Sequence, residues 1–285
     1  MVKSLGIIGA GTMGAGIAQV AALKKIDVYL YDINDTLLRQ GTERIKADYK
    51  RGIQKSKLTN EEMLIALDHL KTRTNLMDLS HCEFIIEAIV EDTRVKKDLF
   101  KRLDENVRPT TILATNTSSI SVTSIASATK KPERVVGMHF FNPAHIMKLV
   151  EVIRGQSTSD ETAQKTFELA KFLDKTPVMV KDTPGFIVNR VARPYYGEAL
   201  RLLGENVASL EQIDRLAKLV GGFAMGPFEL MDLIGIDVNL SVTQSMYDQY
   251  FGEPRYRPHP IQKRMVDAGK LGRKTNEGFY KYEQK

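Results

Sequence analysis

The sequence lacks the features that mark several classes of protein. Its 285 residues include a single cysteine, Cys82. One cysteine excludes an intrachain disulfide framework and fits a reducing compartment, so we expect the cytoplasm. No apolar run approaches the roughly 20 residues that a membrane helix needs, and no zinc or iron ligand spacing is present. Residues 1–9 enter a strand-like pattern at once, which predicts no export signal.

The composition is that of a globular protein, with 42% hydrophobic and 27% charged residues. The length is sufficient for two domains with separate cores. The net charge of +6 is partly local, because residues 44–57 hold six basic side chains against one acid, Asp48. This run is too short for a nucleic-acid track. It is either a solvated helix face or a small patch for a phosphate-rich ligand.

Two kinds of pattern divide the chain. Before residue 183, short apolar runs alternate with helix-length segments, which predicts an α/β domain with a mostly parallel sheet. The expected strands are residues 5–9, 28–31, 84–89, 112–115, 135–140, 149–153 and 178–180. From residue 184 the pattern is helical, with a long helix at 186–203 and a capping-box start at 209–212. We therefore expect a Rossmann-type domain at 1–183 and an all-helical domain at 184–285.

A glycine-rich turn follows the first expected strand and opens a helical segment. It contains Gly9, Gly11, Thr12, Met13 and Gly14, in the pattern G-x-G-x-x-G. Gly9 permits a tight turn, Gly11 lets the backbone approach a pyrophosphate, and Gly14 lets helix and strand pack closely. The amino terminus of the helix offers N–H groups to an anion. The sequence predicts a dinucleotide site here.

An acidic residue indicates which dinucleotide binds. Asp32 ends the second expected strand, 18 residues after Gly14. Its carboxylate can accept hydrogen bonds from the adenosine ribose, whereas the 2'-phosphate of NADP would meet it as a like charge. NAD is therefore the predicted cofactor.

A dehydrogenase needs a group that exchanges the alcohol proton, and histidine titrates near the operating pH. His139 ends an apolar strand at the carboxyl edge of the sheet, where ligands of open α/β sheets bind. His145, shortly after it, is the rival candidate. His69 and His81 fall in polar connecting segments, and His259 lies between two prolines. A histidine in an apolar strand is often only a core residue, so that alternative stays open for His139.

Several motifs resemble the 3-hydroxyacyl-CoA dehydrogenase family over nearly the whole chain. They are residues 139–143 (HFFNP), 147–152 (MKLVEV), 116–119 (NTSS), 182–190 (DTPGFIVNR), 225–230 (MGPFEL) and 278–280 (GFY). Asn276 departs from the glycine common in the family. The resemblance implies a homodimer formed through the helical domain. It also implies an acyl-CoA substrate, with neither nucleic acid nor a membrane as a partner.

The resemblance implies four catalytic residues. His139 is the acid or base, Glu151 orients and supports it, and Ser118 and Asn189 hydrogen-bond the substrate near the reacting oxygen. Each of the last three has a plainer alternative. Ser118 could cap the following helix, Asn189 could make a helix-start hydrogen bond, and Glu151 could pair with a surface lysine.

The resemblance also implies further contacts with cofactor and substrate. The implied cofactor lining is Ala88, Glu91, Lys96, Asn116, Ser118 and Asn142. Lys50, Lys55 and Lys57 could meet the phosphates of coenzyme A.

The expected reaction is the NAD-dependent interconversion of (S)-3-hydroxyacyl-CoA and 3-oxoacyl-CoA in fatty-acid or butanoate metabolism. Short chains are favoured, with 3-hydroxybutyryl-CoA and acetoacetyl-CoA as the pair. Two alternatives stay open. One is a different β-hydroxyacid dehydrogenase with a catalytic lysine, and the other is a non-catalytic relative that binds NAD structurally, as some crystallins do.

Overall fold

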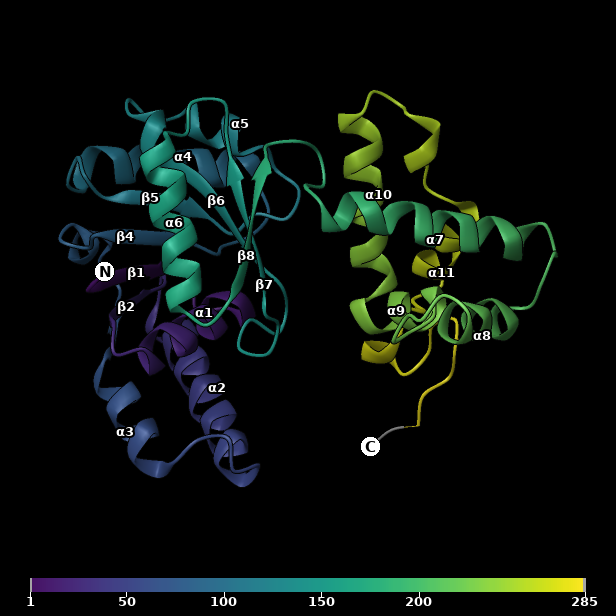
Figure 1. The fold of residues 1–285 in the computed structure, drawn as a ribbon, viewed down its shortest axis with the longest axis horizontal. Coiled ribbons are helices and arrows are strands. Elements are labelled where there is room, and N and C mark those ends of the chain that lie inside the picture. Colours follow the sequence, from purple (N-terminus) through teal and green to yellow (C-terminus); the bar gives the residue numbers. More distant parts are fainter. Residues whose placement is uncertain (1, 284–285) are drawn as a thin grey trace. The chain divides into compact units, whose positions relative to one another are not determined.

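The computed structural model describes residues 2–283 and divides into two compact units between Thr183 and Pro184 (Figure 1). The first unit contains a sheet with helices, and the second is helical. This confirms the predicted fold class. Across the described residues, no helix is both long and apolar enough to cross a bilayer. In the same range, no cluster of His, Cys, Asp or Glu side chains could hold a metal ion.

The first unit is built on one eight-stranded sheet with strand order β3-β2-β1-β4-β5-β6-β7-β8. Adjacent strands are parallel except β6 and β7, which are antiparallel. The elements of this unit are β1 (Ser4–Ile8), α1 (Thr12–Leu23), β2 (Asp27–Tyr31), α2 (Asp35–Gln54), α3 (Asn60–Asp68), β3 (Leu70–Arg73), β4 (Phe84–Glu87), α4 (Thr93–Asn106), β5 (Ile112–Thr115), α5 (Val122–Ala126), β6 (Val135–Phe140), β7 (Leu149–Arg154), α6 (Asp160–Phe172) and β8 (Thr176–Lys181).

Burial explains which strands the sequence reveals. Every residue of β4, β5 and β6 is buried, as in a parallel sheet covered on both faces, so these strands appear as continuous apolar runs. The strand β3 was missed because it lies at the sheet edge and reads Leu-Lys-Thr-Arg, with no residue fully buried. The list of strands expected from the sequence therefore lacks β3.

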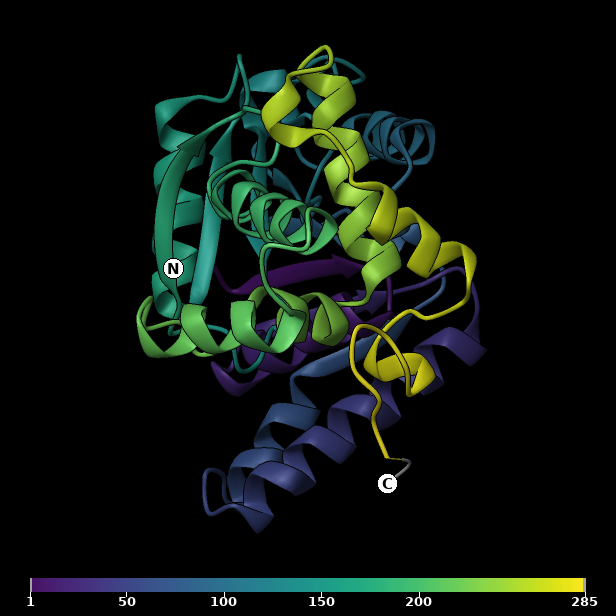
Figure 2. The same cartoon turned by 90° about the vertical axis from the view of Figure 1, so that its right-hand side faces the viewer.

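The helices α2 and α3 extend beyond the sheet as a pair (Figures 1 and 2). Asn34 caps α2, its side chain accepting from Leu37 N at 3.0 Å. A capping box formed by Thr59 and Glu62 starts α3. The buried Tyr49 hydroxyl donates to Gln19 O at 2.8 Å and so fixes α2 against α1.

The second unit contains α7 (Val188–Gly204), α8 (Leu210–Leu219), α9 (Pro227–Ile234), α10 (Ile236–Gln249) and α11 (Pro260–Asp267). The predicted capping box at Ser209 is confirmed, since Ser209 Oγ accepts from Gln212 N and Gln212 Oε1 accepts from Ser209 N. The long helix begins at residue 188, two residues later than expected. Asp232, 1% exposed, accepts from Phe279 N and Tyr280 N at 2.9 Å each and holds the carboxyl-terminal segment in place.

Candidate active site

The glycine turn joins β1 to α1, and each glycine has its own physical reason. Gly9 has a φ of +103°, which favours glycine. A Cβ on Gly14 would lie 1.7 Å from Gly9 O, so only glycine allows this approach of helix to strand. A Cβ on Gly11 would meet nothing within 4 Å. Gly11 therefore leaves open space beside an exposed stretch of backbone.

The start of α1 has the properties of an anion site. Among the described residues, no side chain caps it, and Gly11 and Thr12 are exposed while Met13 is half-buried. The N–H groups of a first helical turn have no partner within the helix, and the dipole there favours a negative charge. The turn therefore fits a pyrophosphate.

Asp32 lies beside this turn at the end of β2. Its Oδ2 accepts from Ala10 N at 2.6 Å, and its Oδ1 accepts from Ile33 N at 2.7 Å. Two backbone N–H groups thus fix a half-buried carboxylate against the glycine turn. This is the placement that recognition of an adenosine ribose requires.

His139 and Glu151 form a buried pair across β6 and β7. The two residues stand directly opposite each other in the antiparallel register. His139 Nδ1 lies 2.8 Å from Glu151 Oε2, with His139 6% and Glu151 0% exposed. The alternative of a surface ion pair between Glu151 and a lysine is therefore wrong.

The pairing distinguishes the two ring nitrogens of His139. An ionised carboxylate only accepts, so Nδ1 of His139 carries the hydrogen that Glu151 receives. Nε2 is then the ring nitrogen that does not face Glu151. The ring of Phe141 packs against the imidazole, with centroids 4.5 Å apart.

The rival, His145, has a weaker pairing. It lies in the connection between β6 and β7, and its Nδ1 is 3.9 Å from Asp48 Oδ2 on α2. Burial lowers the pKa of His145, with Asp48 opposing the shift. The remaining histidines have structural partners: His69 lies 3.1 Å from an Asp27 oxygen, His81 packs edge-on against Tyr29, and His259 caps α11.

The residues expected around the cofactor follow the carboxyl ends of the central strands. Ala88 follows β4, and its carbonyl oxygen would be 2.6 Å from a Cβ on Gly9. Asn116 follows β5 and accepts from Phe140 N at 2.8 Å, which links β5 to the end of β6. Asn142 is exposed just beyond β6. Parallel strands bring these positions to one edge of the sheet.

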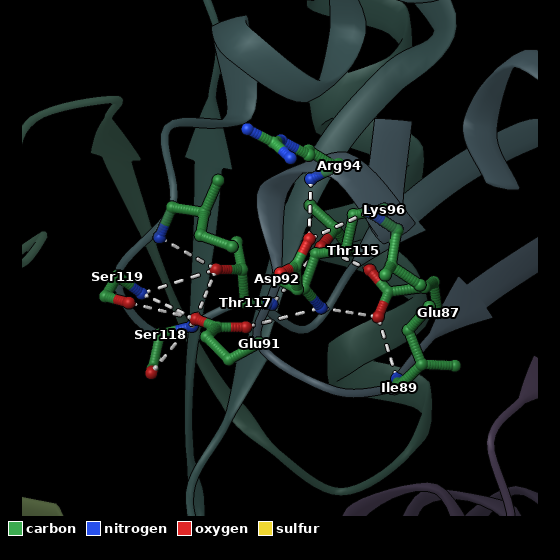
Figure 3. A network of polar contacts seen from close by, with 12 residues as sticks. Glu87, Ile89, Glu91, Asp92, Arg94, Lys96, Thr115, Thr117, Ser118 and Ser119 are labelled. Atoms are coloured by element: carbon green, nitrogen blue, oxygen red, sulfur yellow. Dashed lines mark hydrogen bonds and ion pairs between the residues drawn. The ribbon is translucent and has the colours of Figure 1, made fainter. Parts of the chain in front are cut away.

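Glu91 and Ser118 are also brought together. Ser118 N donates to Glu91 Oε1 at 2.9 Å (Figure 3). The following helix, α5, is capped by Ser121, which accepts from Ser124 N. The alternative role of Ser118 as that cap is therefore wrong.

Lys96 is buried beside the carboxylate that ends β4. It is 1% exposed, and its Nζ donates to Glu87 Oε1 at 2.5 Å. Sequence reasoning missed Glu87, the last residue of β4. A carboxylate that ends an otherwise apolar run was the available signal.

The last predicted residues lie on helices and their connections rather than on the strands of the sheet. Asn189 is the second residue of α7, in the helical unit. Lys50 on α2, and Lys55 and Lys57 between α2 and α3, are exposed at the end of the projecting helix pair. Within the same basic run, Lys46 pairs with Glu43, so only part of its charge is available to a ligand.

Comparison with known proteins agrees with this geometry. Family models match residues 4–183 as the NAD binding domain, and residues 185–282 as the C-terminal domain, of 3-hydroxyacyl-CoA dehydrogenase. The 3-hydroxybutyryl-CoA dehydrogenase of Clostridioides difficile is 46% identical over 98% of this chain and 99% of its own length. The mitochondrial hydroxyacyl-coenzyme A dehydrogenase of Homo sapiens is 42% identical over 99% of this chain and 92% of its own.

A solved structure gives the same result. The (S)-3-hydroxybutyryl-CoA dehydrogenase of Ralstonia eutropha matches with a TM-score of 0.96 and 43% identity, covering 100% of both chains. The match to an NAD binding domain also confirms the predicted cofactor. The chain belongs to the 3-hydroxyacyl-CoA dehydrogenase family of NAD-dependent oxidoreductases.

Proposed function

We propose that this chain interconverts (S)-3-hydroxybutyryl-CoA and acetoacetyl-CoA, with NAD as the redox partner. The observation that carries the proposal is the buried pair of His139 and Glu151, 2.8 Å apart at the ligand-binding edge of the sheet. The short acyl chain is supported by the names of the relatives from Clostridioides difficile and Ralstonia eutropha. Family membership excludes the alternative of a different β-hydroxyacid dehydrogenase that uses a catalytic lysine.

The residues divide the chemistry between them. When bound, NAD supplies the hydride acceptor for oxidation, and NADH supplies the donor for reduction. His139 Nε2 takes the proton of the 3-hydroxyl during oxidation, and Glu151 stabilises the resulting imidazolium. Ser118 and Asn189 hydrogen-bond the reacting oxygen or the thioester carbonyl and so restrict the orientation of the substrate. In reduction, the His139 imidazolium returns the proton to the new hydroxyl.

The cofactor site is proposed to centre on the glycine turn. Gly9, Gly11 and Gly14 shape the backbone around the pyrophosphate, with the first N–H groups of α1 at Thr12 and Met13. Asp32 binds the ribose and disfavours NADP. The sheet edge beyond the turn is completed by Ala88, Glu91, Asn116, Ser118 and Asn142.

The test is the absorbance of reduced nicotinamide when the purified protein meets acetoacetyl-CoA, with NADH and NADPH compared at equal concentration. We expect rapid oxidation of NADH and a lower kcat/KM with NADPH, because the 2'-phosphate would lie against the Asp32 carboxylate. A folded protein that binds NADH but turns over no acyl thioester would instead favour the non-catalytic, structural NAD-binding relative.

The exposed lysines at the end of α2 and just after it, Lys50, Lys55 and Lys57, are proposed to bind the phosphates of coenzyme A. Replacing Lys50 and Lys57 by methionine together should raise KM for acetoacetyl-CoA by up to about tenfold, since each exposed charge contributes about 0.2–1 kcal/mol. KM for acetoacetyl-pantetheine, which has neither a diphosphate nor a 3'-phosphate, should not change. Lys165→Met, at an exposed position on α6, is the control. Equal effects on both substrates would end the proposal.

The helical unit is proposed to form a homodimer. Apolar side chains are exposed along the end of α8 and the segment after it: Leu216 is 62%, Leu219 72%, Val220 79% and Phe223 52% exposed. Such a patch usually marks an interaction surface. Light scattering would measure the molar mass and so distinguish a dimer from a monomer.

We also propose the cytoplasm as the location, since the one cysteine is buried and free. Cell fractionation would test this location.

A further inference from the structure

The helical unit contains a buried cation with no counterion. Arg193 of α7 is 4% exposed. Its Nη1 donates to the Asn239 carbonyl oxygen and to the Thr243 hydroxyl, at 2.9 Å each, and both acceptors on α10 are neutral. Among residues 2–283, no carboxylate forms an ion pair with this guanidinium. Burial lowers the pKa of Arg193 to about 10, the direction expected of a cation that lacks a compensating charge.

Two buried donors in the same cluster have no acceptor. Arg193 Nε and Asn239 Nδ2 are enclosed, and the described part of the chain offers neither of them a hydrogen-bond partner. The Asn239 Oδ1 accepts from Gln262 Nε2 at 2.7 Å, which identifies Nδ2 as the donor of that amide. Buried donors in native proteins are nearly always paired, with protein groups or with a bound species. The cluster thus has both a positive charge to neutralise and donors to satisfy.

A small cavity lies against Arg193. Its volume is about 10 Å³, which is room for one water molecule or one small ion. Its walls come from α7, from α10 and from the segment 255–262. Arg255, Arg257 and His259 line it together with Arg193, and none of the described residues that line it is acidic. The lining therefore favours an anion.

The three basic side chains opposite Arg193 differ in what they can offer a ligand. Arg255 is partly engaged, since its Nε lies 3.6 Å from Glu253 Oε1. Arg257 is exposed, and no carboxylate in the described range pairs with it. His259 Nδ1 accepts a backbone N–H at 3.3 Å, so the hydrogen of the neutral ring is on Nε2. Burial lowers the pKa of His259 and so favours this neutral form.

We propose that the cavity binds one monatomic, monovalent anion, and that chloride is the ion it takes. Charge favours an anion over water, because a water molecule could satisfy the donors but would leave the buried guanidinium uncompensated. Size limits the ligand to a single small ion, which rules out phosphate and carboxylate ligands. The bound anion accepts from Arg193 and from the side chains at the rim, and so links α7, α10 and the segment before α11. The proposal does not depend on the reaction that the chain catalyses.

The first test measures the melting temperature of the full chain while sodium chloride replaces sodium gluconate at a constant total of about 0.2 M, so that charge screening stays the same. An anion that binds the folded protein alone stabilises it increasingly as its concentration rises. We expect chloride to raise the melting temperature by about 2–4 °C, and bromide to act in the same way. A melting temperature that does not respond to chloride overturns the proposal.

Two variants separate the site from a general salt effect. In Arg193→Met the buried charge is gone, and the rise with chloride should disappear. Arg257→Met changes only an exposed side chain, so this variant should fold as the parent does and need about twofold to fivefold more chloride for half of the rise. Arg102→Met, at an exposed position of α4, is the control and should respond as the parent does. A rise that persists unchanged in both site variants contradicts the proposal.

Crystals grown with bromide in place of chloride locate the ion. The anomalous signal of bromide should give a peak in this cavity, in contact with Arg193, and crystals of Arg193→Met should give none there. A peak in a protein whose melting temperature ignores chloride would show an adventitious ion only, which counts against the proposal. An ordered water molecule in place of the peak would do the same.

Discussion

Replacing His139 with glutamine should lower kcat for acetoacetyl-CoA reduction by about a hundredfold to ten-thousandfold, the usual contribution of a general acid or base. Glutamine has a similar length, and its amide can still donate to Glu151. It cannot carry and release a proton, so only the acid–base function is removed. The rate of NADH oxidation at saturating substrate measures the effect.

The control for this prediction is His145→Gln, which changes the rival histidine in the same way. That variant should keep most of the parental kcat, because His145 meets Asp48 only at 3.9 Å and lies outside the β6–β7 register. NADH binding and the melting temperature of the His139 variant should match the parent. The assignment would be wrong if the His139 variant kept more than about a tenth of the parental kcat.

Gly14→Ala is the second change with a large expected effect. Its Cβ would lie 1.7 Å from Gly9 O and 2.9 Å from Gly9 C, both backbone atoms that cannot rotate away. Helix α1 would have to move from β1, which should lower the free energy of unfolding by about 3 kcal/mol or more. NADH binding should be lost with it, because the turn that supplies the N–H groups is displaced. Thermal unfolding and NADH titration measure the two effects.

Gly11→Ala, three residues earlier in the same turn, is the matched comparison. A Cβ there meets nothing within 4 Å, so the variant should keep the parental stability. Its methyl group would, however, enter the space through which a pyrophosphate approaches the backbone, and Kd for NADH should rise. If both variants were equally stable, or if Gly11→Ala bound NADH as the parent does, our account of the turn would be incorrect.

The glycine turn and the candidate histidine could be predicted because their signals are local. The spacing of the glycines follows from close contacts within the turn itself, and His139 is the penultimate residue of a strand that is buried throughout. Strand β3 gave no such signal, because edge strands are often short and carry charged side chains, as the sequence Leu-Lys-Thr-Arg does. An edge strand that forms by pairing with another strand leaves a weaker sequence pattern than a turn whose shape its own glycines determine.

The partners of the site residues were harder to predict. Glu151 faces His139 because β7 runs antiparallel to β6, and a strand's direction is not encoded in its apolar pattern. Only the resemblance suggested that contact. Glu87 and Lys96 pair between the end of a strand and a helix, and each alone looks like an ordinary charged residue. Such contacts depend on tertiary geometry that no short window of sequence contains.

The antiparallel pairing of β6 with β7 also limits how this family can change its chain length. Side chains alternate between the two faces of a strand, so one residue inserted in β7 before Glu151 would turn the carboxylate away from His139. Insertions and deletions of single residues should therefore be purged during evolution from the part of β7 that precedes Glu151.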